Sequence, residues 1–188
     1  MADNKKLAFL MVDFETPDFI KELHNKIPED ELFTDPDDEV FNYGLEKETH
    51  TTLAACLDND VDLDEIKKIL LPLKDYGVAL TDVSMFGNKD YDVLKCNAAS
   101  MNLYVTNKKI LDKFPSHSEF KEYHPHVTIG YLKKVVLRST RRMFWTSLSF
   151  SNPSDSISHI LMRMVNSNIK LGSDIVTCLQ RNNVGLSG

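Results

Sequence analysis

Two histidine–threonine pairs are the residues of this chain best suited to chemistry. His50 and Thr52 form one pair, and His126 and Thr128 form the other, 76 positions further on, each in an apolar, β-prone stretch. Because side chains alternate faces along a strand, each histidine points to the same side as its threonine. If both strands face one site, that site holds two imidazoles and two hydroxyls.

Two imidazoles provide what the metal-free cleavage of a phosphodiester requires. A neutral imidazole takes the proton of the attacking hydroxyl, and an imidazolium gives a proton to the leaving oxygen. Threonine hydroxyls can then donate hydrogen bonds to the phosphoryl oxygens. The sequence does not assign the acid and the base. Taken singly, each histidine is more often a partly buried strand residue bonded to backbone, and only the matched pairing favours a site.

A metal site is the alternative use of these histidines, because His124 and His126 flank Pro125 with strand parity. No third and fourth ligand stands at a useful spacing, since His24, His117 and His159 fall on a helix, in a polar loop and in the C-terminal segment. We therefore predict neither a metal nor another cofactor.

Apolar periodicity predicts a chain in which strands and helices alternate. Helices are expected at residues 17–27, 62–71 and 106–114, and strands at residues 6–14, 49–57, 78–86, 91–98 and 127–132, with a further extended piece at 103–105. Each His/Thr pair falls on a strand in its own half of this series. The order suggests an α+β domain with two similar lobes and a cleft between them.

Three segments carry a resemblance to a known family. They are Gly-Leu-Glu-Lys-Glu-Thr-His-Thr-Thr-Leu (44–53), Phe-Gly-Asn-Lys-Asp-Tyr-Asp-Val-Leu-Lys (86–95) and the stretch 123–133, which contains Tyr-His-Pro-His-Val-Thr-Ile-Gly-Tyr-Leu. In the sequence of these segments the chain resembles the 2H phosphoesterase superfamily, which includes the 2′-5′ RNA ligase-like proteins. Within it, the three segments are most similar to those of phage anti-CBASS proteins, which cleave the cyclic oligonucleotide messengers of bacterial defence.

The resemblance implies a fold, an activity and a set of site residues. The implied fold has two lobes, with antiparallel sheets around a central cleft and flanking helices. His50 and His126 are the implied catalytic histidines, and Thr52 and Thr128 the implied phosphate contacts. The implied function is a metal-independent hydrolase of cyclic di- or trinucleotides, with a phage counter-defence role in the bacterial cytoplasm.

Two other functions stay open at this point. The same site would suit RNA ends carrying 2′,3′-cyclic phosphates or 2′-5′ linkages. A non-catalytic sponge that binds a cyclic nucleotide is the third interpretation, although a binder has no need of a general acid.

Substrate-binding residues are predicted from aromatic and basic side chains near these motifs. Tyr43 and Phe86 are favoured for base stacking because they adjoin Gly44 and Gly87 at expected loop edges, with Phe14, Tyr123 and Tyr131 as further candidates. Lys133, which ends the second motif strand, is preferred over Lys47 and Lys95 as a phosphate contact. Packing is the alternative for each aromatic residue, and a solvated surface position for each lysine.

Charge argues against some partners. A formal net charge of −6 disfavours binding to long nucleic acid, which needs many Lys and Arg on one face. No apolar run approaches the roughly 18 residues of a membrane span, and the first residues do not resemble a signal peptide. We expect a cytoplasmic protein that contacts neither membrane nor long nucleic acid, of undetermined oligomeric state.

Composition changes after Lys134. All five arginines lie beyond this residue and no glutamate does. We therefore predict a 2H phosphoesterase domain at 1–134 and a divergent Arg/Ser-rich segment at 135–188. Poor order of this segment is one hypothesis. A helix face within 157–165, a strand added to one lobe, and a basic lid around residues 138–145 are further hypotheses for this segment.

Overall fold

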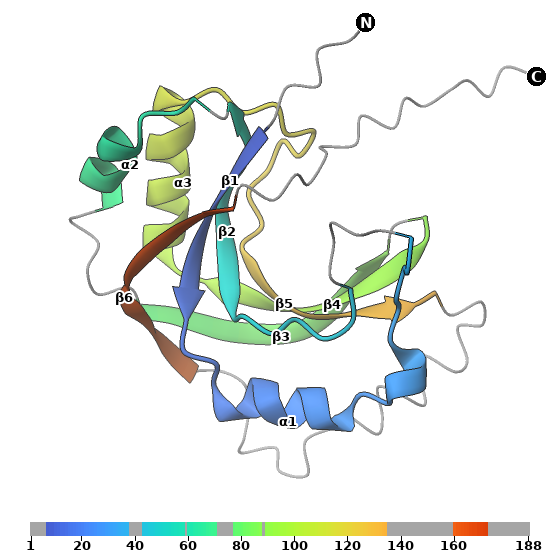
Figure 1. The fold of residues 1–188 in the computed structure, drawn as a ribbon. Coiled ribbons are helices and arrows are strands. Elements are labelled where there is room, and N and C mark those ends of the chain that lie inside the picture. The colour runs from blue at the N-terminus through green and yellow to red at the C-terminus, as the bar shows by residue number, and fades with distance from the viewer. Residues whose placement is uncertain are drawn as a thin grey trace, which may run out of the picture.

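Strands and helices alternate along the chain as the sequence predicts. The computed structural model describes residues 7–37, 43–58, 60–70, 77–87, 89–134 and 160–172, the last of these as backbone. In chain order the elements are β1 (Leu7–Phe14), α1 (Asp18–Lys26), a 3-10 turn η1 (Glu29–Glu31), β2 (His50–Asp58), α2 (Leu63–Leu70), β3 (Gly77–Gly87), β4 (Tyr91–Ala99), α3 (Met101–Lys113), β5 (His126–Lys133) and β6 (Ile160–Gly172) (Figure 1). The α+β class is confirmed.

The strands form one closed barrel in the order β1-β2-β5-β4-β3-β6, and every pairing is antiparallel. β1, β2 and β6 make one half, where α3 packs against β2. β3, β4 and β5 make the other half, where α1 packs against β5 (Figure 1). This is the expected arrangement of two lobes with antiparallel strands and flanking helices, joined here at β2/β5 and at β3/β6.

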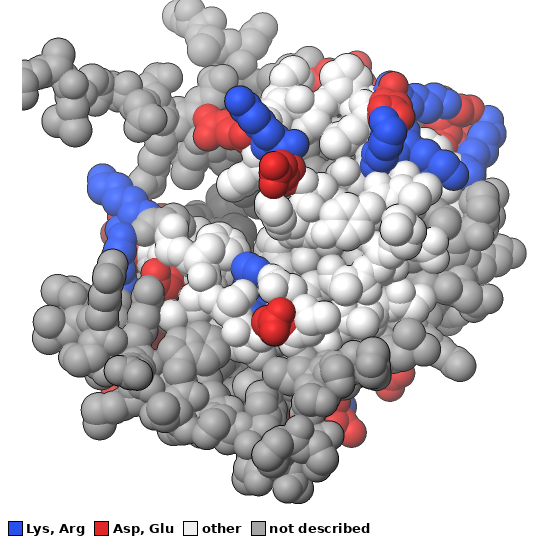
Figure 2. Space-filling model, turned by 180° about the vertical axis from the view of Figure 1, so that it is seen from behind, with Lys and Arg blue, Asp and Glu red and all other residues white. Residues whose placement is uncertain are grey.

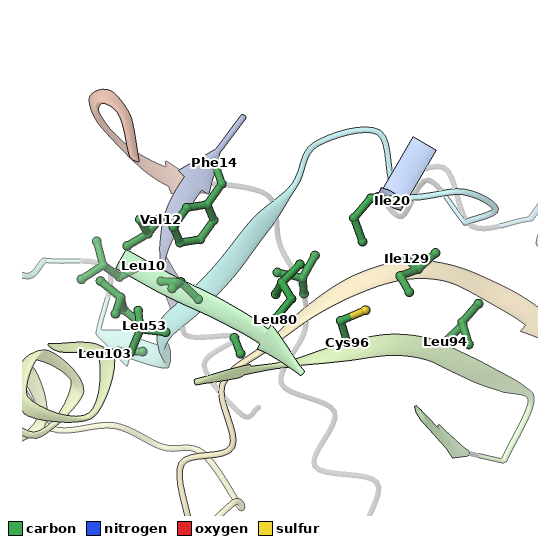
Figure 3. Close-up of a cluster of buried hydrophobic side chains, with 14 of the residues drawn as sticks. Leu10, Val12, Phe14, Ile20, Leu53, Leu80, Leu94, Cys96, Leu103 and Ile129 are labelled. Atoms are coloured by element: carbon green, nitrogen blue, oxygen red, sulfur yellow. The ribbon is translucent and has the colours of Figure 1, made fainter. Parts of the chain in front are cut away.

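The hydrophobic core is one continuous cluster with a part in each half. Leu103 of α3 lies with Leu10 and Leu53 in one part, and Ile20 of α1 faces Ile129 in the other (Figure 3). Each of these side chains is at most 1% exposed, and burying one such group stabilises the fold by roughly 1.5–3 kcal/mol. The helices thus hold β2 and β5, the two strands that carry the His/Thr pairs.

α3 begins earlier than the sequence predicts, since residues 103–105 belong to this helix and not to an extended piece. Leu103, Thr106, Asn107 and Ile110 are its buried residues and follow helical spacing. Two of the four are polar, which concealed the apolar period. Asn107 nonetheless fits the core, because its Nδ2 donates a hydrogen bond of 2.7 Å to the Leu53 carbonyl.

β6 crosses the predicted domain boundary. It lies within 135–188 but pairs with β1 from Phe9↔Gly172 to Phe14↔Met164, and with β3 from Gly77↔Arg163 to Leu80↔Ile160. The division of the chain at 134 stays a prediction, whereas the helix face suggested within 157–165 is wrong for 160–165, which form a strand. A short apolar run is compatible with both a helix and a strand, so only the pairing with β1 and β3 distinguishes the two. Residues 138–145, the suggested lid, lie outside the described residues.

None of the helices in the described ranges is long and apolar enough to cross a membrane.

Candidate active site

Pairing between β2 and β5 brings the two His/Thr pairs together. The strands are antiparallel, with Thr51 opposite Val127, so His50 lies beside Thr128 and Thr52 beside His126. Thr51 and Val127 are both fully buried, whereas the four motif residues are half-buried. Since alternate residues point to opposite faces, the motif side chains share the sheet face that points away from the core. We call it the His/Thr face.

Both histidines are oriented by the same local hydrogen bond. Nδ1 of His50 lies 2.9 Å from the Glu48 carbonyl oxygen, and Nδ1 of His126 lies 2.9 Å from the His124 carbonyl oxygen. A carbonyl only accepts, so each Nδ1 carries the proton and donates it. Nε2 is then the nitrogen left to exchange a proton with a substrate, and no hydrogen bond to Nε2 of either ring is found within the described residues.

β4 adds a lysine and an asparagine to the His/Thr face. Lys95 pairs with Thr128 and Asn97 with His126, while Cys96 between them is buried opposite Val127. Lys95 Nζ donates to Asn97 Oδ1, which fixes the ammonium group beside the motif residues. Burial lowers the pKa of Lys95 from its ordinary value. The sequence ranked this lysine below Lys133, and the strand pairing that distinguishes them is invisible without the fold.

Phe86 and His126 form an edge-to-face contact, with ring centroids 5.7 Å apart and an interplanar angle of 77°. Phe86 comes from β3, so the structure brings this predicted residue to the His/Thr face. Burial is the main cause that lowers the pKa of His126 below its ordinary value, and the positive charge of Lys95 acts in the same direction. His126 is thereby favoured in its neutral form.

β1 borders the site on the opposite side. Asp13 pairs with His50 and Met11 with Thr52, so an acidic residue flanks His50 whereas a basic residue lies near His126. The two imidazoles are thus placed in different electrostatic surroundings, although their local hydrogen bonds match.

Two further residues position the motif strands without belonging to the motifs. Thr51 Oγ1 donates a hydrogen bond of 3.0 Å to the His126 carbonyl, across the β2/β5 junction. Tyr123 Oη donates one of 3.0 Å to the Thr52 carbonyl. Thr51 was missed because a threonine in a strand is ordinary; its complete burial is the signal that identifies it.

Tyr43 lies in an aromatic cluster. Its ring centroid is 4.9 Å from that of Phe33, 5.1 Å from that of Tyr91 and 5.5 Å from that of Tyr131. Three rings therefore surround it, an environment that matches the packing role left open for this residue.

Lys133 lies apart from the motif residues. It is five positions beyond Thr128 on β5, a separation of about 16 Å along a strand, and its Nζ donates a hydrogen bond of 2.7 Å to the Asp30 carbonyl. Lys95 instead lies beside Thr128, with which it pairs across β4 and β5.

Metal-ligating side chains do not gather in groups of three or more anywhere in the described residues. His124, the third histidine of the motif region, uses its carbonyl to orient His126, and its ring Nε2 lies 3.3 Å from the Glu122 carboxylate at an exposed position.

Comparisons with known proteins give a distant structural likeness. No family model and no curated protein matches this chain. Solved structures do match. Kluyveromyces marxianus Usb1 with uridine monophosphate gives a TM-score of 0.43 at 13% identity, covering 77% of this chain and 81% of that one. A second Kluyveromyces marxianus Usb1 structure gives 0.42 at 14%, covering 82% of this chain and 81% of that one. At these values neither match identifies a substrate.

Proposed function

We propose that this protein is a metal-independent phosphodiesterase that cleaves cyclic oligonucleotides by acid–base catalysis with His50 and His126. The observation that carries the proposal is the shared orientation of the two rings. Both Nδ1 atoms are held by carbonyls 2.9 Å away, so two Nε2 atoms remain for proton transfer on one sheet face.

The roles of the two histidines differ in this mechanism. The lowered pKa of His126 keeps its imidazole neutral near pH 7, so His126 Nε2 accepts the proton of the attacking 2′-hydroxyl. The 2′-oxygen bonds to phosphorus, the bond to the 5′-oxygen breaks, and His50 gives that oxygen its proton. The products are a 2′,3′-cyclic phosphate and a free 5′-hydroxyl. Water opens the cyclic phosphate when the two histidines exchange roles.

Charge stabilisation comes from the hydroxyls and the ammonium group beside the histidines. Thr52 and Thr128 donate hydrogen bonds to the phosphoryl oxygens, and Lys95, fixed by Asn97, faces the negative charge that develops on them. Fixed donors of this kind lose no energy to reorganisation during the reaction. Such a site suits one phosphate at a time.

A small cyclic substrate fits the surface charge better than a long strand. On the face shown in Figure 2, the Lys side chains of the described residues are interleaved with Asp and Glu instead of forming one basic patch. Long nucleic acid relies on many clustered phosphate contacts, whereas a cyclic di- or trinucleotide relies on a few. The sequence resemblance of residues 44–53, 86–95 and 123–133 supports a phage counter-defence role, and hence action in the bacterial cytoplasm.

A substrate panel tests this proposal. Purified protein in EDTA is incubated with cyclic di- and trinucleotides, linear 2′-5′ oligoadenylates and RNA ending in a 2′,3′-cyclic phosphate, and products are separated chromatographically. We expect cleavage of a cyclic oligonucleotide. Cleavage confined to the linear RNAs would reassign the substrate, and binding without any turnover would indicate a sponge.

A further inference from the structure

A cavity of about 390 Å³ lies next to the His/Thr face. Its volume is within the range of about 300–1,000 Å³ that small-ligand sites occupy. Its walls come from four parts of the chain: Thr81 from β3, Asn97 from β4, Met101 and Tyr104 from α3, and His124 from the segment before β5. None of these side chains exchanges a proton in the proposed reaction.

The cavity and the catalytic face share two structural links. Asn97 lines the cavity and pairs with His126 across β4 and β5. His124 lines it too, and its carbonyl oxygen holds His126 Nδ1 at 2.9 Å. A group bound in the cavity would therefore sit beside His126 and not beside His50.

Tyr104 offers a fixed aromatic surface in this cavity. Its side chain is 47% exposed, and its ring centroid lies 5.4 Å from that of Tyr123 in an edge-to-face arrangement. Tyr123 is itself anchored, because its hydroxyl donates to the Thr52 carbonyl. An aromatic ring held in this way can stack with a base at little entropic cost.

Asn97 offers a hydrogen-bond donor for the edge of the same group. Its Oδ1 accepts from Lys95 Nζ, which orients the amide and leaves the Nδ2 hydrogens as donors. A ring nitrogen or carbonyl oxygen of a nucleobase is a suitable acceptor. The cavity thus combines a stacking surface with an oriented polar contact, as base-binding sites do.

We propose that this cavity binds the nucleobase attached to the sugar on the His126 side of the scissile phosphate. The inference rests on the proposed function and extends it, since it assigns a specificity site to Tyr104 and Asn97. The other base of the substrate lies outside the cavity, so the two bases contribute unequally to binding.

Calorimetric titration of the full chain tests this assignment. In a His50→Ala background, which prevents turnover, the ligands are a dinucleoside 3′,5′-phosphate and two analogues, each lacking one base. We expect loss of the base on the His126 side of the phosphate to weaken binding by about 5- to 150-fold, the range for stacking of a single base. Tyr104→Ala should weaken the intact ligand similarly and should not weaken further the analogue that lacks that base.

Two variants serve as controls for this titration. Tyr104→Phe should retain binding because the ring remains, and Leu111→Ala, which truncates an exposed residue of the same helix away from the cavity, should have no effect. If Tyr104→Ala weakens all three ligands equally, or none of them, the assignment is wrong.

Parallel cleavage assays with the wild-type protein separate the two proposals. If the wild type cleaves the substrate but Tyr104→Ala leaves ligand affinity unchanged, the base site is rejected and the phosphodiesterase is retained. The expected binding pattern without any cleavage by the wild type rejects the phosphodiesterase and retains the base site.

Discussion

At the scale of single residues, Lys95 has the most distinctive expected role. It pairs with Thr128 and is fixed by Asn97, and its charge lowers the pKa of His126. Lys95→Gln should therefore reduce kcat/KM by about 10- to 100-fold, the value of a hydrogen bond to a charged group. Because removing the positive charge raises the pKa of the His126 base, the acidic limb of the pH–rate profile should move to higher pH.

The matched control for this measurement is Lys109→Gln, which changes an exposed lysine on the outer surface of α3. It should alter neither the rate nor the profile. An unchanged acidic limb in Lys95→Gln would separate Lys95 from His126 and contradict this electrostatic coupling.

The motif threonines should matter less than the histidines. Thr52→Ala and Thr128→Ala each remove one phosphoryl hydrogen bond, worth about 1–3 kcal/mol when the acceptor is charged. We expect kcat/KM to fall by roughly 5- to 150-fold in either variant, and serine substitutions to restore most of it. Full activity in the alanine variants would place the phosphate elsewhere.

At the scale of elements, the β2/β5 junction should depend on Thr51. Its Oγ1 bonds the His126 carbonyl at 3.0 Å from a fully buried position. Thr51→Val keeps the shape and leaves that carbonyl without this donor, so unfolding free energy should fall by about 1–3 kcal/mol. Because Thr51 positions the motif strands, Thr51→Val should lower kcat more than it raises KM. Thr51→Ser should restore both stability and kcat. A stability loss with unchanged kcat would show a purely structural role.

Gly44 lies in the segment before β2 that bonds to β5. Its φ is +102°, and its carbonyl accepts a hydrogen bond of 2.8 Å from the Tyr131 amide. Gly44→Ala should cost about 1–2 kcal/mol, because a side chain disfavours this backbone region. Chemical denaturation measures the change, with Thr34→Ala in an exposed loop as the control. No loss in Gly44→Ala would mean that this turn tolerates another conformation.

Most of the helices and strands could be predicted from the sequence, and the exceptions have physical causes. β1, β2, β3, β4 and β5 follow apolar patterns that short strands produce reliably. α3 was predicted too short because Thr106 and Asn107 take core positions that apolar residues usually fill. At the site, the motif residues could be named, but Lys95 and Thr51 depend on register across strands, which local sequence does not encode.

At the scale of the whole molecule, an ion network links α2 to α3. Glu65 accepts from Lys113 and from Lys68, and Lys113 is the larger cause that lowers the pKa of Glu65 from 4.5 to about 2. A carboxyl with a lowered folded pKa stabilises the fold above its unfolded pKa and stops doing so as pH falls. We expect part of the stability to disappear between about pH 4.5 and 2.

Urea denaturation across this pH range measures that contribution. Glu65→Gln should remove the pH dependence that the network supplies, and high salt should reduce it in the wild type because these groups are exposed. Glu119→Gln, which changes an exposed carboxyl outside this network, is the control. An identical pH dependence in Glu65→Gln and wild type would contradict the network's role.

The most direct test of the whole account is single-turnover cleavage of a cyclic oligonucleotide in EDTA by variants of the two histidines. His50→Ala and His126→Ala should each lose about 10²–10⁴-fold in rate, the contribution of one general acid or base, while both remain folded by circular dichroism. His117→Ala, which removes an exposed histidine that contacts Asp58, should cleave at the wild-type rate. A wild-type rate in either of the two motif variants would contradict the two-imidazole mechanism.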